Sequence, residues 1–504
     1  MPKKKTKKSL TKKSFRRNFL FALSGFLLVL FLFSPFAKIN PIWYEPPVIE
    51  SKNGVLDATL IVKKALVDIG GKKVESVVYN GQYPGPTFKI KPGDSFRVNV
   101  VNQAAQNTNL HFHGSHVSPK ENGDNVFIDI KPGEEFQYEY NVPTNHSPGL
   151  YWYHPHWHST SEEQVLDGMA GAIEMTGGLD ELPGIKDVPV RRLVLSTVDG
   201  KNQNTPIRLV NGKKNPILYM QPGQTYRLEV FNISADDFYN FSIPGMTLYM
   251  ISQDGNPMAK VMDKDSMLLS PGNRVQMLIK AGMPGLYEVK SLAFDQGFAK
   301  YVDDTFMTIK VQGLPVVPHP LPTTLIPHVD LRTATIDKVR TLTFSMGKDK
   351  ENPTFLLDGK MFDMNRVDQV ITLGTTEEWH LINEGNEWHP FHIHINPFQV
   401  ISVNGQPVED QAYWDTFAIP PHGEVIMRTR YTDFDGKFVL HCHILFHEDH
   451  GMMQVVQIVD PNNPSASEQN SAMDSIYMDS MHQHMVAPRP ISERGKRVEK
   501  NHEM

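Results

Sequence analysis

Apolar and polar residues alternate along short runs of this chain, and turn residues separate one run from the next. In the segment 95–102 (SFRVNVVN), the apolar side chains stand mostly at every second position after a Pro-Gly turn. Alternation of this kind is typical of a strand with one buried face. Long helical periodicity is scarce, and 35 Gly and 37 Pro residues favour short strands joined by turns. The pattern therefore predicts an all-β protein.

One arrangement of strands and turns occurs three times. The copies begin at Asn80 (NGQYPGPTFKIKPGDSFRVNVVN), Asn211 (NGKKNPILYMQPGQTYRLEVFN) and Asp358 (DGKMFDMNRVDQVITLGTTEEWHLIN), 131 and 147 residues apart. A second shared block follows each copy: KPGEEFQYEY with PGLYWYHPH, SPGNRVQMLI with PGLYEVKSL, and PPHGEVIMRT with DGKFVLHCH. Repeats of this length fit Greek-key β-sandwich domains.

We therefore predict three β-sandwich domains. Their limits are set at 48–178, 179–320 and 335–460. The Pro-rich segment 314–327 (LPVVPHPLPTTLIP) is predicted to be an extended linker into the third domain.

Four histidine pairs have one residue between their members. They are His111/His113, His154/His156, His392/His394 and His441/His443. On a strand, residues two apart point to the same face, so each pair presents two rings together. Eight converging imidazoles are enough for about three copper ions, and imidazole suits copper. One pair alone is weak evidence, because most histidines are structural, but four pairs are not independent accidents.

The last pair flanks Cys442, the only cysteine in the chain, in HCHILFHEDHGMM. His447 follows five residues later and Met452 ten residues later. Two histidines, a thiolate and a long axial methionine form an electron-transfer copper site. His389 is the best placed second histidine. Because His441 and His443 point away from the Cys442 face of a strand, they are expected to bind a second centre a few bonds away.

The motifs HFHG, HPHWH, HPFHIH and HCHILFHEDHGMM together resemble the multicopper oxidase family, which includes laccases and bacterial copper-efflux oxidases. The resemblance covers about residues 48–460 and implies three cupredoxin domains that hold four copper ions. It implies a type 1 copper at His389, Cys442, His447 and Met452, and a type 2 copper at His111 and His392. It assigns the type 3 pair to His113, His154, His156, His394, His441 and His443.

The resemblance also implies a proton-relaying carboxylate at Glu448. A second acidic residue often follows the first histidine pair in the family. Here that region reads KENGDN, with Asn122 near the expected place and Asp124 two residues further on. We take Asp124 as the candidate.

The middle repeat keeps the strand pattern and lacks the histidines. Asn240 and Ser242 were matched to the first pair, and Lys290 and Ser291 to the second. The middle domain is therefore predicted to be a spacer, with the three-copper cluster lying between the first and third domains.

Charge is unevenly distributed. The 504 residues carry a net charge of −6, but residues 1–17 contain nine Lys or Arg and no acid, so the rest carries −6 − 9 = −15. This acidic body has no basic stripe for nucleic acid and would modestly attract cations. A single cysteine excludes a disulfide within the chain.

The segment 1–40 is predicted to be a targeting or anchor segment. Its basic start precedes an apolar stretch at 18–37, the order of a secretory signal, and residues 16–20 (RRNFL) resemble a twin-arginine signal. No clear cleavage site follows, so an uncleaved membrane anchor stays an alternative. The protein is expected to be exported to the periplasm or cell surface.

The tail 461–504 is low in apolar residues and is predicted to be disordered. It carries thioethers and imidazoles suited to Cu(I), namely Met473, Met478, Met481, His482, His484 and Met485. Copper capture by this tail is one hypothesis, and a mobile tail with scattered methionines is the other.

These features together predict an enzyme that couples one-electron oxidation of a small substrate to four-electron reduction of O2, acting as a monomer. The predicted substrate is Cu(I), for copper tolerance, although no long methionine-rich insertion precedes Cys442. Phenols and aromatic amines are the main alternative, followed by ferrous or manganous ions. A non-catalytic export or division factor of this fold would lack copper ligands, and a two-domain nitrite reductase would lack the third repeat.

Overall fold

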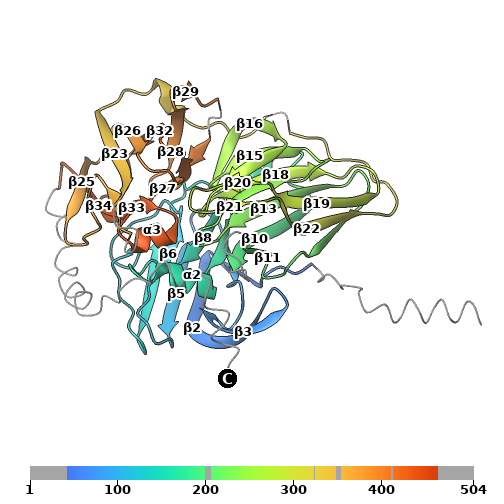
Figure 1. Ribbon diagram of the computed structural model, residues 1–504, viewed down its shortest axis with the longest axis horizontal. Helices are drawn as coiled ribbons and strands as arrows, with labels where there is room; N and C mark the ends of the chain where they lie inside the picture. The colour runs from blue at the N-terminus through green and yellow to red at the C-terminus, as the bar shows by residue number, and fades with distance from the viewer. Residues whose placement is uncertain (1–42, 199–205, 323, 348–352, 410–411, 464–504) are drawn as a thin grey trace, which may run out of the picture. The chain divides into compact units, whose positions relative to one another are not determined.

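The computed structural model describes residues 43–198, 206–322, 324–347, 353–409 and 412–463. Strands make up most of its regular structure, so the all-β prediction is confirmed (Figure 1). The described helices are short: α2 (Ser161–Asp167), α3 (Leu445–Asp449), and the 3-10 turns η1 (Gly178–Glu181) and η2 (Leu331–Thr333). None of the described helices has the length and apolar character needed to cross a membrane.

The strands form three pairs of sheets. In the first pair, one sheet has the order β3-β2-β5-β7 and the other β1-β4-β9-β8-β6. Their bounds are β1 (Val48–Glu50), β2 (Val55–Ile69), β3 (Lys72–Tyr79), β4 (Thr87–Ile90), β5 (Ser95–Asn102), β6 (His111–His113), β7 (Glu135–Asn141), β8 (Gly149–His154) and β9 (Gly171–Met175).

The second pair repeats this plan with a six-stranded sheet, β11-β10-β13-β18-β15-β16, and a five-stranded sheet, β12-β22-β19-β14-β17. A short ribbon, β20-β21, accompanies them. The bounds are β10 (Val190–Val198), β11 (Ile207–Val210), β12 (Ile217–Met220), β13 (Thr225–Asn232), β14 (Tyr239–Ser242), β15 (Leu248–Gln253), β16 (Asn256–Lys264), β17 (Ser266–Leu269), β18 (Arg274–Lys280), β19 (Gly285–Ser291), β20 (Phe294–Asp295), β21 (Lys300–Tyr301) and β22 (Asp304–Val311).

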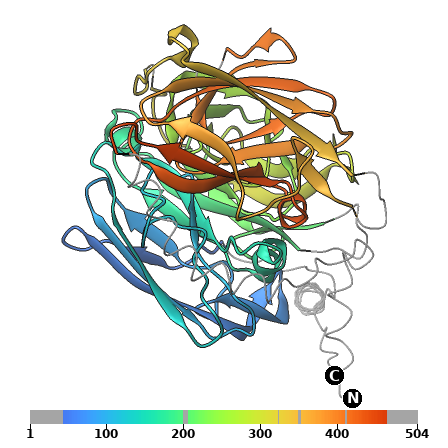
Figure 2. The same cartoon turned by 90° about the vertical axis from the view of Figure 1, so that its left-hand side faces the viewer.

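The third pair consists of β24-β23-β26-β32-β28-β29, with β30 beside β28, and β25-β34-β33-β27-β31. Figure 2 shows its orange to red strands stacked in layers. The bounds are β23 (Lys338–Met346), β24 (Phe355–Leu357), β25 (Val367–Thr372), β26 (Thr376–Asn383), β27 (His389–Ile393), β28 (Phe398–Val403), β29 (Gln406–Pro407), β30 (Tyr413–Trp414), β31 (Thr416–Ile419), β32 (Glu424–Arg430), β33 (Gly436–Cys442) and β34 (Met453–Val459).

The alternation of apolar and polar residues along a strand corresponds to alternating buried and partly exposed side chains in the structure. Along β5 every second side chain is buried, and Phe96, Val98 and Val100 enter the first core. Two further buried clusters occupy the second and third sheet pairs. Each sandwich thus buries one face of each sheet, the arrangement that stabilises packed sheets. Contacts between residues do not separate the described part of the chain into smaller units. The exact limits of the three domains therefore stay a prediction.

An asparagine ends the equivalent strand in each repeat: Asn102, Asn232 and Asn383. Each side-chain oxygen accepts from the backbone N–H two residues on, at 3.0, 3.1 and 2.8 Å respectively. Each amide donates to a carbonyl of the loop that precedes the next strand, that of Gln106, Asp237 or Glu387, and to a carbonyl further along the chain, that of Ile130, Leu269 or Ile419. These loops lead into β6, β14 and β27, and two of those strands carry the histidine pairs.

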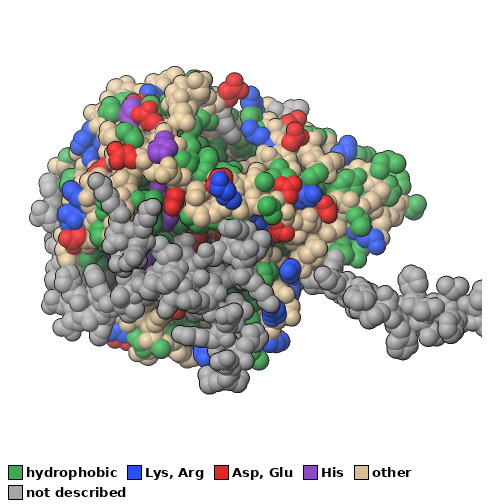
Figure 3. Space-filling model, in the orientation of Figure 1, with side chains coloured by type: hydrophobic (Ala, Val, Ile, Leu, Met, Phe, Trp, Pro, Cys, Tyr) green, Lys and Arg blue, Asp and Glu red, His purple; other side chains and the backbone are tan. Residues whose placement is uncertain are grey.

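The segment 1–40 and almost all of the tail 461–504 lie outside the described residues. The predictions made for them stay predictions. On the face shown in Figure 3, basic and acidic side chains are interspersed over the described surface.

Candidate metal centres

Three buried side chains of the third sheet pair converge on one point: His389 from β27, Cys442 from β33 and His447 from α3. The Cys442 Sγ lies 3.6 Å from Nδ1 of His389 and 3.6 Å from Nδ1 of His447, and these two nitrogens are 3.2 Å apart. β27 and β33 are paired, with Phe391 opposite Cys442, so the sheet register sets the first two positions. The α3 turn then returns His447 to the same point.

Met452 lies beside this group. It is fully buried in the same hydrophobic cluster as Cys442, and the Cys442 N–H donates to the Met452 carbonyl at 3.0 Å. The Met452 N–H in turn donates to the His447 carbonyl at 2.9 Å. Backbone bonding therefore fixes the predicted axial residue next to both ligand-bearing residues.

The spacing of this group suits a metal ion. Bonds of about 2.3 Å to sulfur and about 2.0 Å to nitrogen, separated by ~115°, give a sulfur–nitrogen distance of about 3.6 Å. Burial raises the pKa of the Cys442 thiol well above its usual value. A thiolate at this depth therefore needs a bound cation, and two histidines with one cysteine favour copper.

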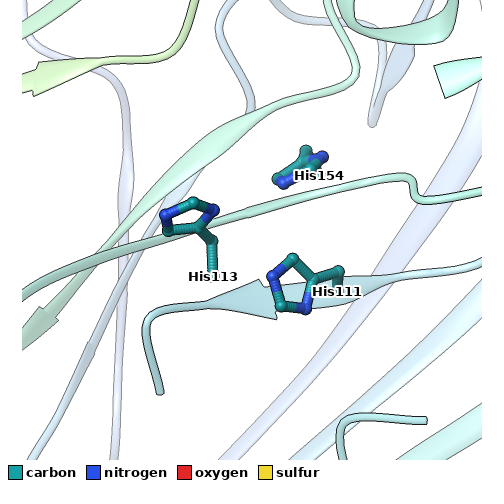
Figure 4. Close-up of side chains that lie close together, drawn as sticks. All are labelled: His111, His113 and His154. Carbon is teal, nitrogen blue, oxygen red and sulfur yellow. The ribbon is translucent and has the colours of Figure 1, made fainter. Parts of the chain in front are cut away.

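The eight paired histidines form a second group, and each is almost or completely buried. His111 pairs with His154 across β6 and β8, and His392 pairs with His441 across β27 and β33. The partner residues His113, His156, His394 and His443 stand two positions further along the chain. Figure 4 shows that His111, His113 and His154 turn their rings toward a common space.

Nitrogens of this group converge in a way that fits metal binding. The His441 Nε2 lies 3.1 Å from Nε2 of His156 and 3.3 Å from Nε2 of His394. The His443 Nε2 lies 3.2 Å from Nδ1 of His113. Tetrahedral ligands with metal–nitrogen bonds of about 2.0 Å lie about 3.3 Å apart.

Other ring nitrogens of the same group have no hydrogen-bond partner although they are buried. These are Nε2 of His111, His154 and His392 and Nδ1 of His394 and His443. Buried polar atoms without partners are rare and call for an explanation, and a bound ion supplies one.

Burial and neighbouring imidazoles keep seven of these eight rings neutral. Burial first, and then the other histidines, hold the pKa of His111, His113, His392, His394 and His443 well below the ordinary value. Burial likewise lowers the pKa of His154 to about 3 and that of His156 to about 4. Neutral imidazole is the form that binds metals.

Acceptors on the outer side of the rings fix which nitrogen faces inward. The His111 Nδ1 lies 2.9 Å from the Asp124 carboxylate, and the His392 Nδ1 lies 2.7 Å from the Asp415 carbonyl. The His154 Nδ1 lies 2.8 Å from its neighbour's carbonyl. Partners of this kind orient metal-binding histidines.

The two predicted proton carriers both contact ligand histidines. Asp124 is buried on His111, and burial raises its pKa to about 7 against the opposing effect of the Phe112 N–H. The Glu448 carboxylate lies 3.0 Å from the His441 Nδ1 and 3.5 Å from the His156 Nδ1. Burial alone would raise the pKa of Glu448, but these imidazoles outweigh it and lower the pKa.

Cys442 therefore joins the two groups through the chain. Its side chain belongs to the first group, and its neighbours His441 and His443 belong to the second. The sequence motifs and their spacing had identified every residue of both groups as a candidate ligand. They gave no sign of Asp415 and Thr416, which contact His113 and His392 from the start of β31, where the sequence shows no recognisable pattern.

The match proposed for the middle repeat was out of register. Ser242 pairs with Lys290 across β14 and β19, the position that His111 and His154 occupy in the first repeat. Ser242, not Asn240, therefore replaces His111, and Pro244 replaces His113. Ser242 stands ten residues after Asn232, whereas His111 stands nine residues after Asn102, so the spacing after the strand-ending asparagine does not carry over to the middle repeat. No imidazole stands at either position, so the absence of the pairs from this repeat is unchanged.

Comparison with known proteins gives the family. Three multicopper oxidase family models match residues 61–177, 186–296 and 332–462. A multicopper oxidase of Staphylococcus haemolyticus is 27% identical over 82% of this chain and 92% of its own length. A laccase of Bacillus stratosphericus is 26% identical over 76% and 90%.

Solved structures agree. The multicopper oxidase of Campylobacter jejuni, described as a metallo-oxidase, superposes with a TM-score of 0.74. It is 28% identical and covers 83% of this chain and 95% of its own. The fold and the buried histidine and cysteine groups define a copper-dependent oxidoreductase. The chain belongs to the multicopper oxidase family.

Proposed function

We propose that this enzyme oxidises Cu(I) and reduces O2 to water with four copper ions. The observation that carries the proposal is the Cys442 segment, which joins the cysteine group to the eight histidines. Copper in the first group supplies a one-electron centre, and copper in the second supplies a centre that reduces O2 with four electrons. Met452 is the proposed axial ligand.

The protein's part in this chemistry is to provide a short covalent connection. An electron that enters at the Cys442 side chain has only the backbone and side-chain bonds of His441 or His443 to cross. Outer acceptors such as Asp124 keep the correct ring nitrogen turned inward. Because all these groups are buried, bulk water is excluded from the connection.

Protons must reach the second group as O2 is reduced. Glu448 and Asp124 are proposed to deliver them, because each carboxylate lies within hydrogen-bonding range of a ligand histidine. The two carboxylates contact different histidines, so each can deliver protons to a different part of the three-copper cluster.

The surface near the cysteine group supports a cationic substrate. The Glu387 carboxylate lies 3.3 Å from the His447 Nε2 and is 17% exposed, whereas His447 is 2% exposed. A cation held at Glu387 would therefore sit one residue from the first copper. The net charge of −15 outside residues 1–17 also favours cations.

Methionine near the same place favours Cu(I) in particular. A Cβ added to Gly385 would lie 3.6 Å from the His389 Nε2 and 3.8 Å from the Met346 Sδ, so the thioether is close to the ligand ring. Met361, which packs against Gly451, is about half exposed. Soft thioether ligands select Cu(I).

Oxidation of phenols is the second candidate. Phe298 and Trp388 are partly buried around the third core, and the Phe298 ring centroid lies 6.0 Å from that of His447. Aromatic side chains at the entry could stack a phenol. The laccase relatives also favour this alternative.

Oxygen consumption decides between the two candidates. Rates are measured with Cu(I) and with a dimethoxyphenol, for the wild type, Glu387→Gln and a control, Glu139→Gln, which changes an exposed carboxylate on β7. We expect Glu387→Gln to lower kcat/KM for Cu(I) about tenfold, with little effect on the phenol. A phenol rate that exceeds the Cu(I) rate and is insensitive to Glu387→Gln would favour the laccase function.

Export is part of the same proposal. It rests on the basic and apolar order of residues 1–40, and the protein would act as a monomer in the periplasm or at the cell surface. Cell fractionation with N-terminal sequencing of the mature protein tests this and separates a cleaved signal from an anchor. Recovery of the protein from the cytoplasm with an intact N-terminus would contradict it.

A further inference from the structure

We infer that Arg274, a residue of the ligand-free middle repeat, is a positioning residue for the three-copper cluster and acts through Asp415 on His113 and His392. The inference rests on the proposed copper chemistry of the eight histidines. It gives the middle repeat a direct role at the cluster, beyond that of a spacer.

Asp415 contacts two ligand histidines from different repeats. It lies between β30 and β31, where its Oδ1 is 3.1 Å from the His113 Nε2 and its backbone carbonyl is 2.7 Å from the His392 Nδ1. The adjacent Thr416 hydroxyl lies 3.2 Å and 3.1 Å from the same two nitrogens. These contacts leave the His113 Nδ1 facing His443 and the His392 Nε2 facing inward.

Arg274 holds Asp415 with two hydrogen bonds. Its Nη1 donates to one carboxylate oxygen at 2.8 Å, and its Nη2 donates to the other at 2.6 Å. A bidentate pair of this kind fixes the plane of the carboxylate as well as its position. Arg274 is fully buried, so this geometry is not open to exchange with water.

Other donors of Arg274 are also committed. Its Nε donates to the Leu150 carbonyl on β8 at 3.0 Å, and its Nη1 donates to the Gly272 carbonyl at 2.9 Å. Its backbone N–H donates to Asp254 at 2.9 Å. The guanidinium is therefore held by the first, middle and third repeats together, and Asp415 cannot shift without moving it.

Asn273 supports the same segment. It donates to the Thr416 carbonyl at 2.8 Å and to Asp254 at 3.1 Å. The loop from Gly272 to Arg274 thus contacts both Asp415 and Thr416, the two residues that orient His113 and His392.

Two glycines leave room for this arrangement. A Cβ at Gly114, the last residue of the HFHG motif, would collide with the Arg274 guanidinium and the Asp415 carboxylate. A Cβ at Gly272, where φ is +91°, would lie 3.1 Å from both the His113 and the His443 rings. The glycine of HFHG is thus explained by the Arg274–Asp415 pair.

A buried ion pair can also serve only to hold sheets together. Arg192, whose side chain is 14% exposed, provides the comparison, because its Nε donates to Glu174 at 2.9 Å and lies 3.6 Å from Glu229, and it joins the first and middle repeats. None of its hydrogen bonds and ion pairs among the described residues involves a ligand histidine. Arg192→Met is therefore the control for a purely structural effect.

The test compares copper-loaded wild type, Arg274→Met, Arg274→Lys, Asp415→Asn and Arg192→Met. The measurements are copper content, the blue absorption, and the type 2 copper signal in electron paramagnetic resonance. Arg274→Met is expected to keep the blue absorption, alter the type 2 hyperfine splitting and weaken copper binding at the cluster about 10- to 100-fold. Arg274→Lys keeps the charge without the planar fork and should restore only part of the signal.

Asp415→Asn keeps the side-chain size, so the inference can still be tested if the arginine variants misfold. It should change the same type 2 signal and leave the blue absorption intact, while Arg192→Met should change neither. An unchanged type 2 signal in both Arg274→Met and Asp415→Asn, or an equal change in Arg192→Met, overturns the inference. A wild type without blue and type 2 signals would overturn the proposed function itself. Substrate preference does not enter these readouts.

Discussion

As the proposed axial ligand of the first copper, Met452 would set the driving force for electron transfer there. An axial thioether stabilises oxidised copper relative to a non-coordinating aliphatic group, because the axial ligand tunes the potential. We expect Met452→Leu, which is close in volume, to raise the type 1 potential. Redox titration of the blue absorption measures it, and an unchanged or lower potential would contradict the axial assignment.

His146 gives a residue-scale prediction about pH. It is buried, its Nε2 accepts from the His116 N–H at 2.9 Å, and burial lowers its pKa from 6.5 to about 4. Between these values the unfolded chain binds the proton and the folded chain does not. Stability is therefore full above pH 6.5 and falls as the pH drops toward 4, by roughly 3 kcal/mol at most.

Urea unfolding of the copper-free protein at pH 7 and pH 5 tests this. His146→Gln keeps an acceptor and a donor but cannot titrate in this range, so it should reduce the loss of stability between the two pH values by about 2 kcal/mol. A loss identical to that of the wild type would show that His146 does not contribute.

The candidate ligand residues could be predicted from the sequence wherever they occur at a characteristic spacing. The HxH pairs and the C-x4-H-x4-M pattern identified every member of the two buried groups except His389, because strand geometry converts fixed spacing into a shared face. His389 was found by its position three residues before His392. Asp124 was also found, by its nearness to HFHG. Asp415 and Arg274 were not, because they reach the histidines through tertiary contacts that leave no mark on local sequence.

At the scale of elements, the strand-ending asparagines link the sheets to the histidine strands. In the middle repeat the Asn232 side chain bonds to segments that carry no copper ligand, so its loss tests the structural effect of these bonds. Asn232→Ala leaves two carbonyls and one N–H without their partner. We expect it to destabilise the copper-free protein by about 2 to 4 kcal/mol.

Denaturant unfolding measures this effect. Asn99→Ala, which removes only an exposed bond to Glu135, should stay within about 0.5 kcal/mol of the wild type. Equal stabilities for the two variants would show that the asparagine does not fix the loop.

Strands and repeats were predictable from alternation and turn residues, but the exact register was not. Ser242 stands ten residues after Asn232, one more than separates His111 from Asn102, and pairing of β14 with β19 fixes the register instead. A slip of this kind changes which side chain faces the centre, although the spacing pattern looks intact.

At the scale of the whole molecule, ion pairs join the repeats. Arg192 joins the first and middle repeats, and Arg274 reaches Leu150 in the first and Asp415 in the third. The sequence predicted three sandwiches with copper ligands in the first and third. It could not show which residues connect them, because such pairs form only when distant segments fold together.

The most direct test is the metal content and spectra of the purified protein and of Cys442→Ser. The account predicts four copper ions and a strong blue absorption in the wild type. In Cys442→Ser the blue absorption and one copper ion are lost, while the type 2 signal in electron paramagnetic resonance remains. A blue absorption that survives in Cys442→Ser, or a wild type that binds zinc and no redox-active metal, would contradict the account.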